Sequence, residues 1–176
     1  MIIAGVSGSG KTTVGAMLAG RLGWPFADAD DFHPAANVEK MRSGIPLTDA
    51  DREPWLQAIA AWMDGHIARA ESGVIGCSAL RRSYRDELLD GRPEARMVFL
   101  ATDRDVLTRR LAARSGHFFP ETLLASQLAA LEPPGPDEHV ICVNPADTPA
   151  ATVDAIIALL FPPGLPGRGG DHEAEA

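Results

Sequence analysis

The chain has 176 residues, with 16 Lys and Arg against 24 Asp and Glu, so its formal net charge is −8 and its pI is about 5.0. General binding to nucleic acids or to anionic membranes requires a basic face, and this charge argues against both. A composition of 45% hydrophobic and 23% charged residues is typical of a globular protein, and the length suits one domain.

Short apolar segments alternate with longer segments of helical spacing along the chain. The strand-like segments, bounded by turn residues or charges, are 1–4, 24–27, 74–77, 96–101 and 139–143. Apolar residues at helical spacing predict helices over 11–22, about 51–70, 103 to about 112, and 153–160. This alternation indicates an α/β fold with a parallel sheet that is covered by helices on both faces.

Apolar runs, signal sequences and cysteines help to predict the cellular location of a protein. The sequence contains no run of about 18 apolar residues and no secretory signal. Cys77 and Cys142 lie far apart in apolar runs. We therefore expect a cytoplasmic protein whose cysteines are small buried side chains without a disulfide. Residues 162–176, rich in Pro, Gly and acidic side chains, are expected to form a disordered tail behind a single domain of residues 1–161.

Residues 5–12 read Gly-Val-Ser-Gly-Ser-Gly-Lys-Thr and match the pattern G-x-x-x-x-G-K-[ST] in full, between an apolar strand and a helix. The glycines let backbone N–H groups turn inward, and the helix N-terminus adds a partial positive charge. Lys11 is expected to reach the β- and γ-phosphates, and the Thr12 hydroxyl to bind Mg²⁺. The motif predicts that the chain binds a nucleoside triphosphate. The residues assigned to this P-loop are Gly5, Val6, Ser7, Gly8, Ser9, Gly10, Lys11, Thr12 and Thr13.

The P-loop alone does not distinguish a GTPase, a motor ATPase and a small-molecule kinase. The sequence has no D-x-x-G, and residues 144–147 (N-P-A-D) lack the lysine of N-K-x-D, which argues against a GTPase. The apolar run of residues 74–77 is followed by Ser78 and Ala79 instead of a carboxylate, which argues against a motor ATPase. The small size favours a kinase whose second substrate lies beside the γ-phosphate.

A cluster of polar residues follows the second predicted strand, over residues 28–33 (D-A-D-D-F-H). Open α/β sheets bind their ligands at the carboxyl ends of the strands, so these side chains are expected beside the P-loop. Asp30 is the candidate to orient or deprotonate a substrate hydroxyl. Asp31 by itself is better explained as a helix-capping residue.

Several longer strings resemble one family. They are D-x-D-x-x-H-P at 28–34, N-x-x-K-M at 37–41, G-x-P-L-x-D-x-D-R-x-P-W-L at 44–56 and C-S-A-L-R-R-S-Y-R-D at 77–86. In this order they resemble the P-loop gluconokinases, which phosphorylate D-gluconate with ATP to give 6-phospho-D-gluconate. The likeness continues through 114–119 and 127–134 and covers residues 2–161.

The resemblance implies a fold like that of nucleoside monophosphate kinases. Its five parallel strands would have the order 2-3-1-4-5, with a helical lid over about 110–132. Relatives of this kind are often homodimers, so a homodimer is possible here. The residues that the resemblance places on the gluconate side are Asp30, His33, Lys40, Arg52, Arg81, Tyr84, Arg85 and His117. Gluconate carries one carboxylate and five hydroxyls, and Arg52 or Arg81 could hold the carboxylate in bidentate fashion.

Arg110 and Arg114 lie four residues apart on a predicted helix, so they share one face. Closure of a lid would bring them onto the transferring phosphoryl group. Asn144 and Pro145 follow the last strand and, by position and resemblance, would lie against adenine. Together the assigned cations would make one cleft basic in an otherwise acidic protein; they are Lys11, Lys40, Arg52, Arg81, Arg110 and Arg114.

Two alternatives to a gluconokinase stay open at this point. The first is another small-molecule P-loop kinase, of the shikimate type or a nucleotide kinase. Such an enzyme would share the P-loop and the D-x-D but not the strings around residues 33–41 and 54–56. The second is a nucleotide-binding module without turnover, which would not need paired lid arginines.

Overall fold

A computed structural model describes residues 1–112 and 121–162. Arg114, His117 and nearly all of the predicted tail lie outside these residues. The five strands are all parallel and form one sheet in the order β2-β3-β1-β4-β5, as predicted. Their bounds are β1 (Ile2–Ala4), β2 (Phe26–Asp28), β3 (Val74–Cys77), β4 (Met97–Leu100) and β5 (Val140–Val143).

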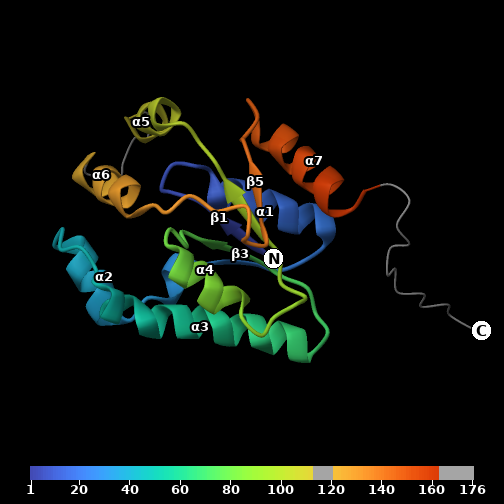
Figure 1. Ribbon diagram of the computed structural model, residues 1–176, viewed down its shortest axis with the longest axis horizontal. Coiled ribbons are helices and arrows are strands. Elements are labelled where there is room, and N and C mark those ends of the chain that lie inside the picture. The colour runs from blue at the N-terminus through green and yellow to red at the C-terminus, as the bar shows by residue number, and fades with distance from the viewer. Residues whose placement is uncertain (113–120, 163–176) are drawn as a thin grey trace, which may run out of the picture.

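Helices cover both faces of the sheet (Figure 1). One face packs against α3 (Asp49–Ala68) and α4 (Arg82–Leu89), and the other against α1 (Lys11–Leu22) and α7 (Pro149–Leu160). Side chains alternate along each strand, so in β1 Ile2 and Ala4 join the α3 side while Ile3 joins the α1 side. Both faces of the sheet are therefore buried, which explains why its interior strands are unbroken apolar runs in the sequence.

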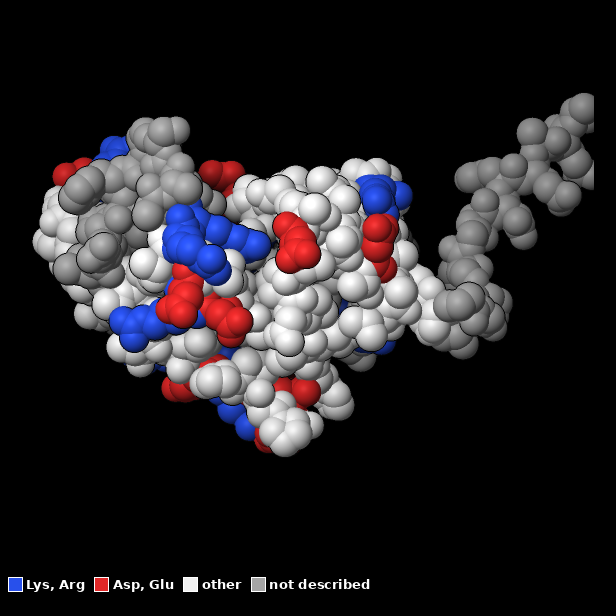
Figure 2. Space-filling model, turned by 90° about the horizontal axis from the view of Figure 1, so that it is seen from above, with Lys and Arg blue, Asp and Glu red and all other residues white. Residues whose placement is uncertain are grey.

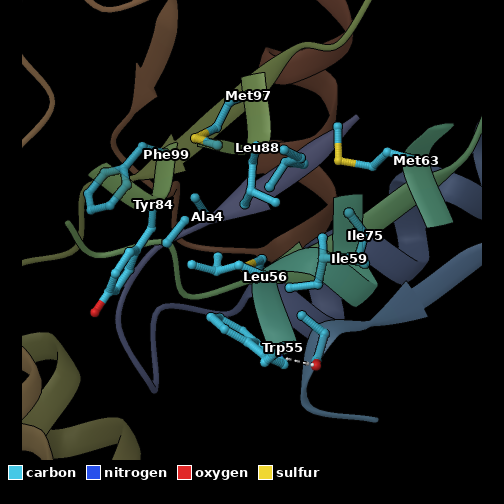
Figure 3. Packing of buried hydrophobic residues seen from close by; sticks show 14 residues of the cluster. Ala4, Trp55, Leu56, Ile59, Met63, Ile75, Tyr84, Leu88, Met97 and Phe99 are labelled. Carbon is cyan, nitrogen blue, oxygen red and sulfur yellow. Dashed lines mark hydrogen bonds between the residues drawn. The ribbon is translucent and has the colours of Figure 1, made fainter. Parts of the chain in front are cut away.

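The long helix α3 forms much of one core and begins with a capping box. The Thr48 side chain accepts a hydrogen bond from the Asp51 N–H, and the Asp51 carboxylate accepts one from the Thr48 N–H. This cap starts the helix two residues before the predicted 51. From there Trp55 and Ile59 project at helical spacing into the core between α3 and the sheet (Figure 3).

The remaining helices are short, and most lie at the carboxyl ends of the strands, on the left in Figure 1. They are the 3₁₀ helix η1 (Ala29–Phe32), α2 (Ala35–Arg42), α5 (Arg104–Ala112) and α6 (Glu121–Ala130). The apolar spacing did not predict α2, because Asn37 is its one buried residue. Its amide donates a hydrogen bond of 2.6 Å to the carbonyl of Asp51, which joins α2 to the start of α3.

The two cysteines differ in a way that the sequence did not predict. Cys77 is buried in the interior strand β3, and burial raises the pKa of its thiol to about 12. Cys142 is exposed, so the expectation that both are buried is wrong for this residue. It lies in β5, an edge strand that has a neighbour on one side only. Both cysteines are free, in agreement with the prediction of no disulfide. Among the described residues, no helix has the length and apolar character needed to cross a bilayer.

Candidate active site

The loop between β1 and α1 has the tight backbone that its glycines predict. Gly5 and Gly10 have φ angles of +142° and +100°. A Cβ on Gly5 would lie 2.8 Å from the Ser9 hydroxyl oxygen and 3.1 Å from the carbonyl oxygen of Leu100. Only glycine fits there without a shift of the loop. Gly10 caps α1, so the loop leads directly into the helix N-terminus, where backbone N–H groups attract anions.

The P-loop also positions its lysine and its threonine. The Lys11 ammonium donates a hydrogen bond of 3.1 Å to the carbonyl of Val6, so the side chain curls back over the loop. The Thr12 hydroxyl donates to Asp28 Oδ2 at 2.9 Å, which ties the start of α1 to the end of β2. Thr13 is exposed in the first turn of the helix.

Asp28 is a site residue that sequence reasoning did not assign, although it is the first Asp of the D-x-D string. Its second carboxylate oxygen accepts the N–H of Asp30 at 3.1 Å, and so begins η1. Hydroxyl and carboxylate oxygens are the ligands that Mg²⁺ takes, usually with waters and substrate phosphates. The described residues contain no cluster of three or more His, Cys, Asp or Glu that could hold a metal by itself. Thr12 and Asp28 therefore fit a Mg²⁺ that is bound together with a nucleotide.

Asp30 and His33 follow at the carboxyl end of β2. Desolvation and the charge of Asp28 raise the pKa of the Asp30 carboxyl, although the residue as a whole is exposed, while Lys11 opposes the shift. The His33 ring stacks on Trp55, with centroids 4.7 Å apart and 7° between the planes. Burial and the charge of Arg52 lower the pKa of His33, which favours the neutral ring at neutral pH. Its Nδ1 is buried and has no partner among the described residues.

Trp55 fixes the platform on which His33 stacks. Its indole N–H donates a buried hydrogen bond of 2.7 Å to the carbonyl of Ala29, drawn as the dashed line in Figure 3. A buried tryptophan needs such a partner for its one polar atom. The bond attaches η1 to α3, so the segment that carries Asp30 is held against the core.

Three further predicted substrate residues gather around one carboxylate. We name Asp49, Arg52, Arg81 and Tyr84 the Asp49 cluster. Oδ2 of Asp49 accepts a hydrogen bond from Arg81 at 2.5 Å, and Oδ1 accepts one from the Tyr84 hydroxyl at 2.5 Å. The Arg52 guanidinium lies 3.8 Å from the same carboxylate and also donates to the carbonyl of Leu47. The structure thus brings residues of α3 and α4 together, as a site requires.

Lys40 is also paired, with Asp51 at 2.6 Å. The predicted cations therefore do not form a purely basic surface, because Asp49 and Asp51 lie among them. Figure 2 shows the same mixing on another face, where Lys and Arg side chains lie beside Asp and Glu. These two carboxylates offset part of the positive charge of the assigned cations, and the net sign of the cleft stays a prediction.

The structure gives Arg85 a different place from its neighbours in the motif. Its side chain is 1% exposed and forms a bidentate ion pair with Glu138, at 2.6 and 2.9 Å. It also donates to the carbonyls of Ala79 and Leu80 in the loop before α4. A guanidinium with these buried partners has no surface to offer a solute, so we correct the expectation for Arg85: it supports the loop that presents Arg81.

The helices α5 and α6 both contact the P-loop. The Arg110 guanidinium donates to the carbonyl of Ser9 at 3.3 Å, so it lies at the P-loop, and its role toward phosphate stays a prediction. From α6, the amide oxygen of Gln127 accepts the N–H of Ser7 at 2.8 Å. Gln127 was not among the assigned site residues. Leu107 and Leu124 pack with Val6, which attaches both helices to the loop.

Asn144 and Pro145 lie directly after β5. Asn144 is exposed and Pro145 is half-buried. Both lie at the carboxyl ends of the parallel strands, where the P-loop also lies. The Ala146 N–H after them donates to the buried Thr152 hydroxyl of α7 at 2.9 Å, which holds this turn in place. Their contact with adenine stays a prediction.

Comparison with known proteins agrees with this geometry. A family described as an AAA domain matches residues 1–134. A gluconokinase of Gluconobacter oxydans is 47% identical over 157 residues, which cover 89% of this chain and 88% of that protein. A thermoresistant gluconokinase of Escherichia coli is 42% identical, over 88% of this chain and 91% of that protein. The chain belongs to the gluconokinase family.

Solved structures of a gluconokinase and of other small-molecule kinases have the same fold. A gluconokinase from Sinorhizobium meliloti superimposes with a TM-score of 0.76 at 41% identity, covering 91% of this chain and 94% of that one. A sugar kinase from a Janibacter species gives 0.83 at 43% identity, covering 90% and 92%. A shikimate kinase from Aquifex aeolicus, at 18% identity, gives 0.55 and shows that the fold is shared more widely. The chain is thus an ATP-dependent kinase of the P-loop class.

Proposed function

We propose that this protein transfers the γ-phosphoryl group of ATP to the terminal hydroxyl of D-gluconate and releases ADP and 6-phospho-D-gluconate. The observation that carries the proposal is the convergence of a complete P-loop, Asp30 and two arginines at one end of the sheet, in a chain 47% identical to a gluconokinase. The P-loop serves the nucleotide and the arginines serve an acidic acceptor.

On the nucleotide side, Lys11 and Arg110 would spread the negative charge that develops on the transferring group. Arg114, which lies outside the described residues, is proposed for the same task. Mg²⁺ would be held by the Thr12 hydroxyl and, through Asp28, by the end of β2. When bound, it would neutralise charge on the phosphates. Asn144 and Pro145 are proposed to border the adenine.

On the acceptor side, Asp30 would hold the terminal hydroxyl in line with the γ-phosphorus and accept its proton. A raised pKa suits this task, because it makes the carboxylate a better proton acceptor than an ordinary Asp. Arg52 or Arg81 would bind the gluconate carboxylate at the other end of the sugar acid. Tyr84, His33 and Lys40, and His117 outside the described residues, would serve the hydroxyls between.

The alternatives can be separated by activity. Purified protein with MgATP and D-gluconate should form 6-phosphogluconate, which a coupled dehydrogenase detects as reduced nicotinamide. Shikimate and nucleoside monophosphates serve as matched acceptors and should give no turnover above the ATPase background. If shikimate or a nucleoside monophosphate is phosphorylated and gluconate is not, the assignment of gluconate as the substrate is wrong. Binding of ATP with no product from any acceptor would favour the non-catalytic module. The cytoplasmic location and the homodimer stay predictions.

A further inference from the structure

Asp49, the first residue of α3, connects Arg52 and Arg81, the two candidates for binding the acceptor carboxylate. Its carboxylate is bonded from two directions, by Arg81 before α4 and by Tyr84 within α4. Arg52 lies one turn further along α3 and is 3.8 Å away. The Asp49 side chain is nevertheless 61% exposed. Through these partners the exposed carboxylate joins the start of α3 to the start of α4.

The arrangement needs a negative charge at its centre. The Arg52 and Arg81 guanidinium carbons lie 5.9 and 5.8 Å from the centre of the same Tyr84 ring, so two like charges are held close together. An Asp carboxylate is ionised at neutral pH, and the hydrogen bond from Tyr84 and the two arginines lower the pKa of Asp49 further. Without it, the guanidiniums would repel each other and lose their common acceptor.

Arg81 depends on Asp49 more than Arg52 does. Arg52 has a second bond, to the carbonyl of Leu47 at 2.7 Å. For Arg81, Asp49 is the one hydrogen-bonding partner of the side chain among the described residues, and that bond uses a single terminal nitrogen. A guanidinium has five N–H donors, so most of those on Arg81 stay available to a ligand.

We propose that Asp49 is a positioning residue for recognition of the acceptor carboxylate. It orients Arg52 and Arg81 against Tyr84 with their open N–H edges toward the acceptor, and it leaves the cluster with a net charge of +1, which suits one carboxylate. The inference rests on the proposed function and adds a residue that acts through the arginines. A direct alternative is that Asp49 competes with the substrate for them.

The test uses the full-length enzyme and separates these effects by kinetics. KM for gluconate, KM for ATP and kcat are measured for Asp49→Asn, Asp49→Glu, Arg81→Ala and the double variant Asp49→Asn/Arg81→Ala. The matched control is Asp64→Asn. Asp64 lies on the same helix, 56% exposed, and pairs with Arg92 at 2.6 Å, but it is about 22 Å further along the axis. Thermal melting monitored by circular dichroism confirms that each variant is folded.

We expect Asp49→Asn to raise KM for gluconate by roughly tenfold or more, as for the loss of a charge-assisted contact. KM for ATP and kcat should change by less than about threefold, because the reacting hydroxyl lies at the other end of the acceptor. Asp49→Glu should restore part of the loss. In the Arg81→Ala background, Asp49→Asn should have a much smaller effect, because its action passes through that arginine.

Three results would overturn the inference. A lower KM for gluconate in Asp49→Asn would mean that Asp49 competes with the substrate. An unchanged KM would mean that it does nothing for the site, and additive effects in the double variant would mean that it does not act through Arg81. The proposed function fails separately, if the wild-type enzyme and Asp64→Asn do not phosphorylate gluconate.

Discussion

The buried pair of Arg85 and Glu138 offers the sharpest test of how the site is supported. The side chains are 1% and 4% exposed, and two short hydrogen bonds join them. Replacing Glu138 with Gln would leave the guanidinium charge buried without its counter-charge. Removal of one partner of a buried pair typically costs 3–5 kcal/mol, so we expect Glu138→Gln to lower the free energy of unfolding by about 3 kcal/mol. That is more than a hundredfold in the ratio of folded to unfolded protein.

The measurement is urea denaturation at neutral pH, with Asp64→Asn as the matched control. Asp64 also pairs with an arginine in bidentate fashion, at 2.6 and 2.8 Å, but it is exposed. Its replacement should cost less than about 1 kcal/mol, because water already solvates such a pair. The double variant Arg85→Met/Glu138→Leu should recover part of the stability lost in Glu138→Gln, since it buries no charge but removes the hydrogen bonds to the carbonyls of Ala79 and Leu80.

The same variants also separate structure from function. If Arg85 only supports the loop before α4, the double variant should stay folded. Any rise in its KM for gluconate should then be accompanied by a lower free energy of unfolding. If Glu138→Gln lowers the free energy of unfolding by less than about 1 kcal/mol, the pair of Arg85 and Glu138 is not buried as described. A fully stable double variant that has lost gluconate binding alone would return Arg85 to the substrate site.

Further predictions concern the nucleotide side and the start of α3. Lys11→Ala should reduce kcat by about 10³-fold or more in a protein that melts normally, and unimpaired turnover would reject the P-loop assignment. Arg110→Ala should reduce kcat similarly while its exposed neighbour Arg109→Ala should not, and equal effects would contradict a specific role. Hydrogen bonds from Lys40 and Thr48 lower the pKa of Asp51 from 3.8 to about 2. The ionised Asp51 therefore stabilises the fold above pH 4, and this stabilisation is lost as the pH falls toward 2. Asp51→Asn should lower the melting temperature at pH 7 but hardly at pH 2, and an equal loss at both would contradict this.

Periodicity and motif spacing were enough to predict the layout of the protein. The apolar run Val74–Cys77 is buried on both faces of a central strand, and its predicted bounds are those of β3. The P-loop lies between β1 and α1 because its glycines, its lysine and the strand before it are neighbours in sequence. Two helices of eight residues each, α2 and α4, escaped prediction, and α2 buries only the polar Asn37, so no apolar stripe marks it.

The sequence by itself thus determined the family, the α/β class and the phosphate-binding loop, because these depend on local patterns. Only the tertiary structure separated Arg81 from Arg85, two arginines of one motif, four residues apart. Arg81 meets Asp49 at the start of α3, and Arg85 meets Glu138, 53 residues later in the chain. Which carboxylate faces which guanidinium, and whether water reaches the pair, depends on how the sheet order brings distant segments together. The same dependence left Cys142 exposed on an edge strand, although its apolar neighbours predicted burial.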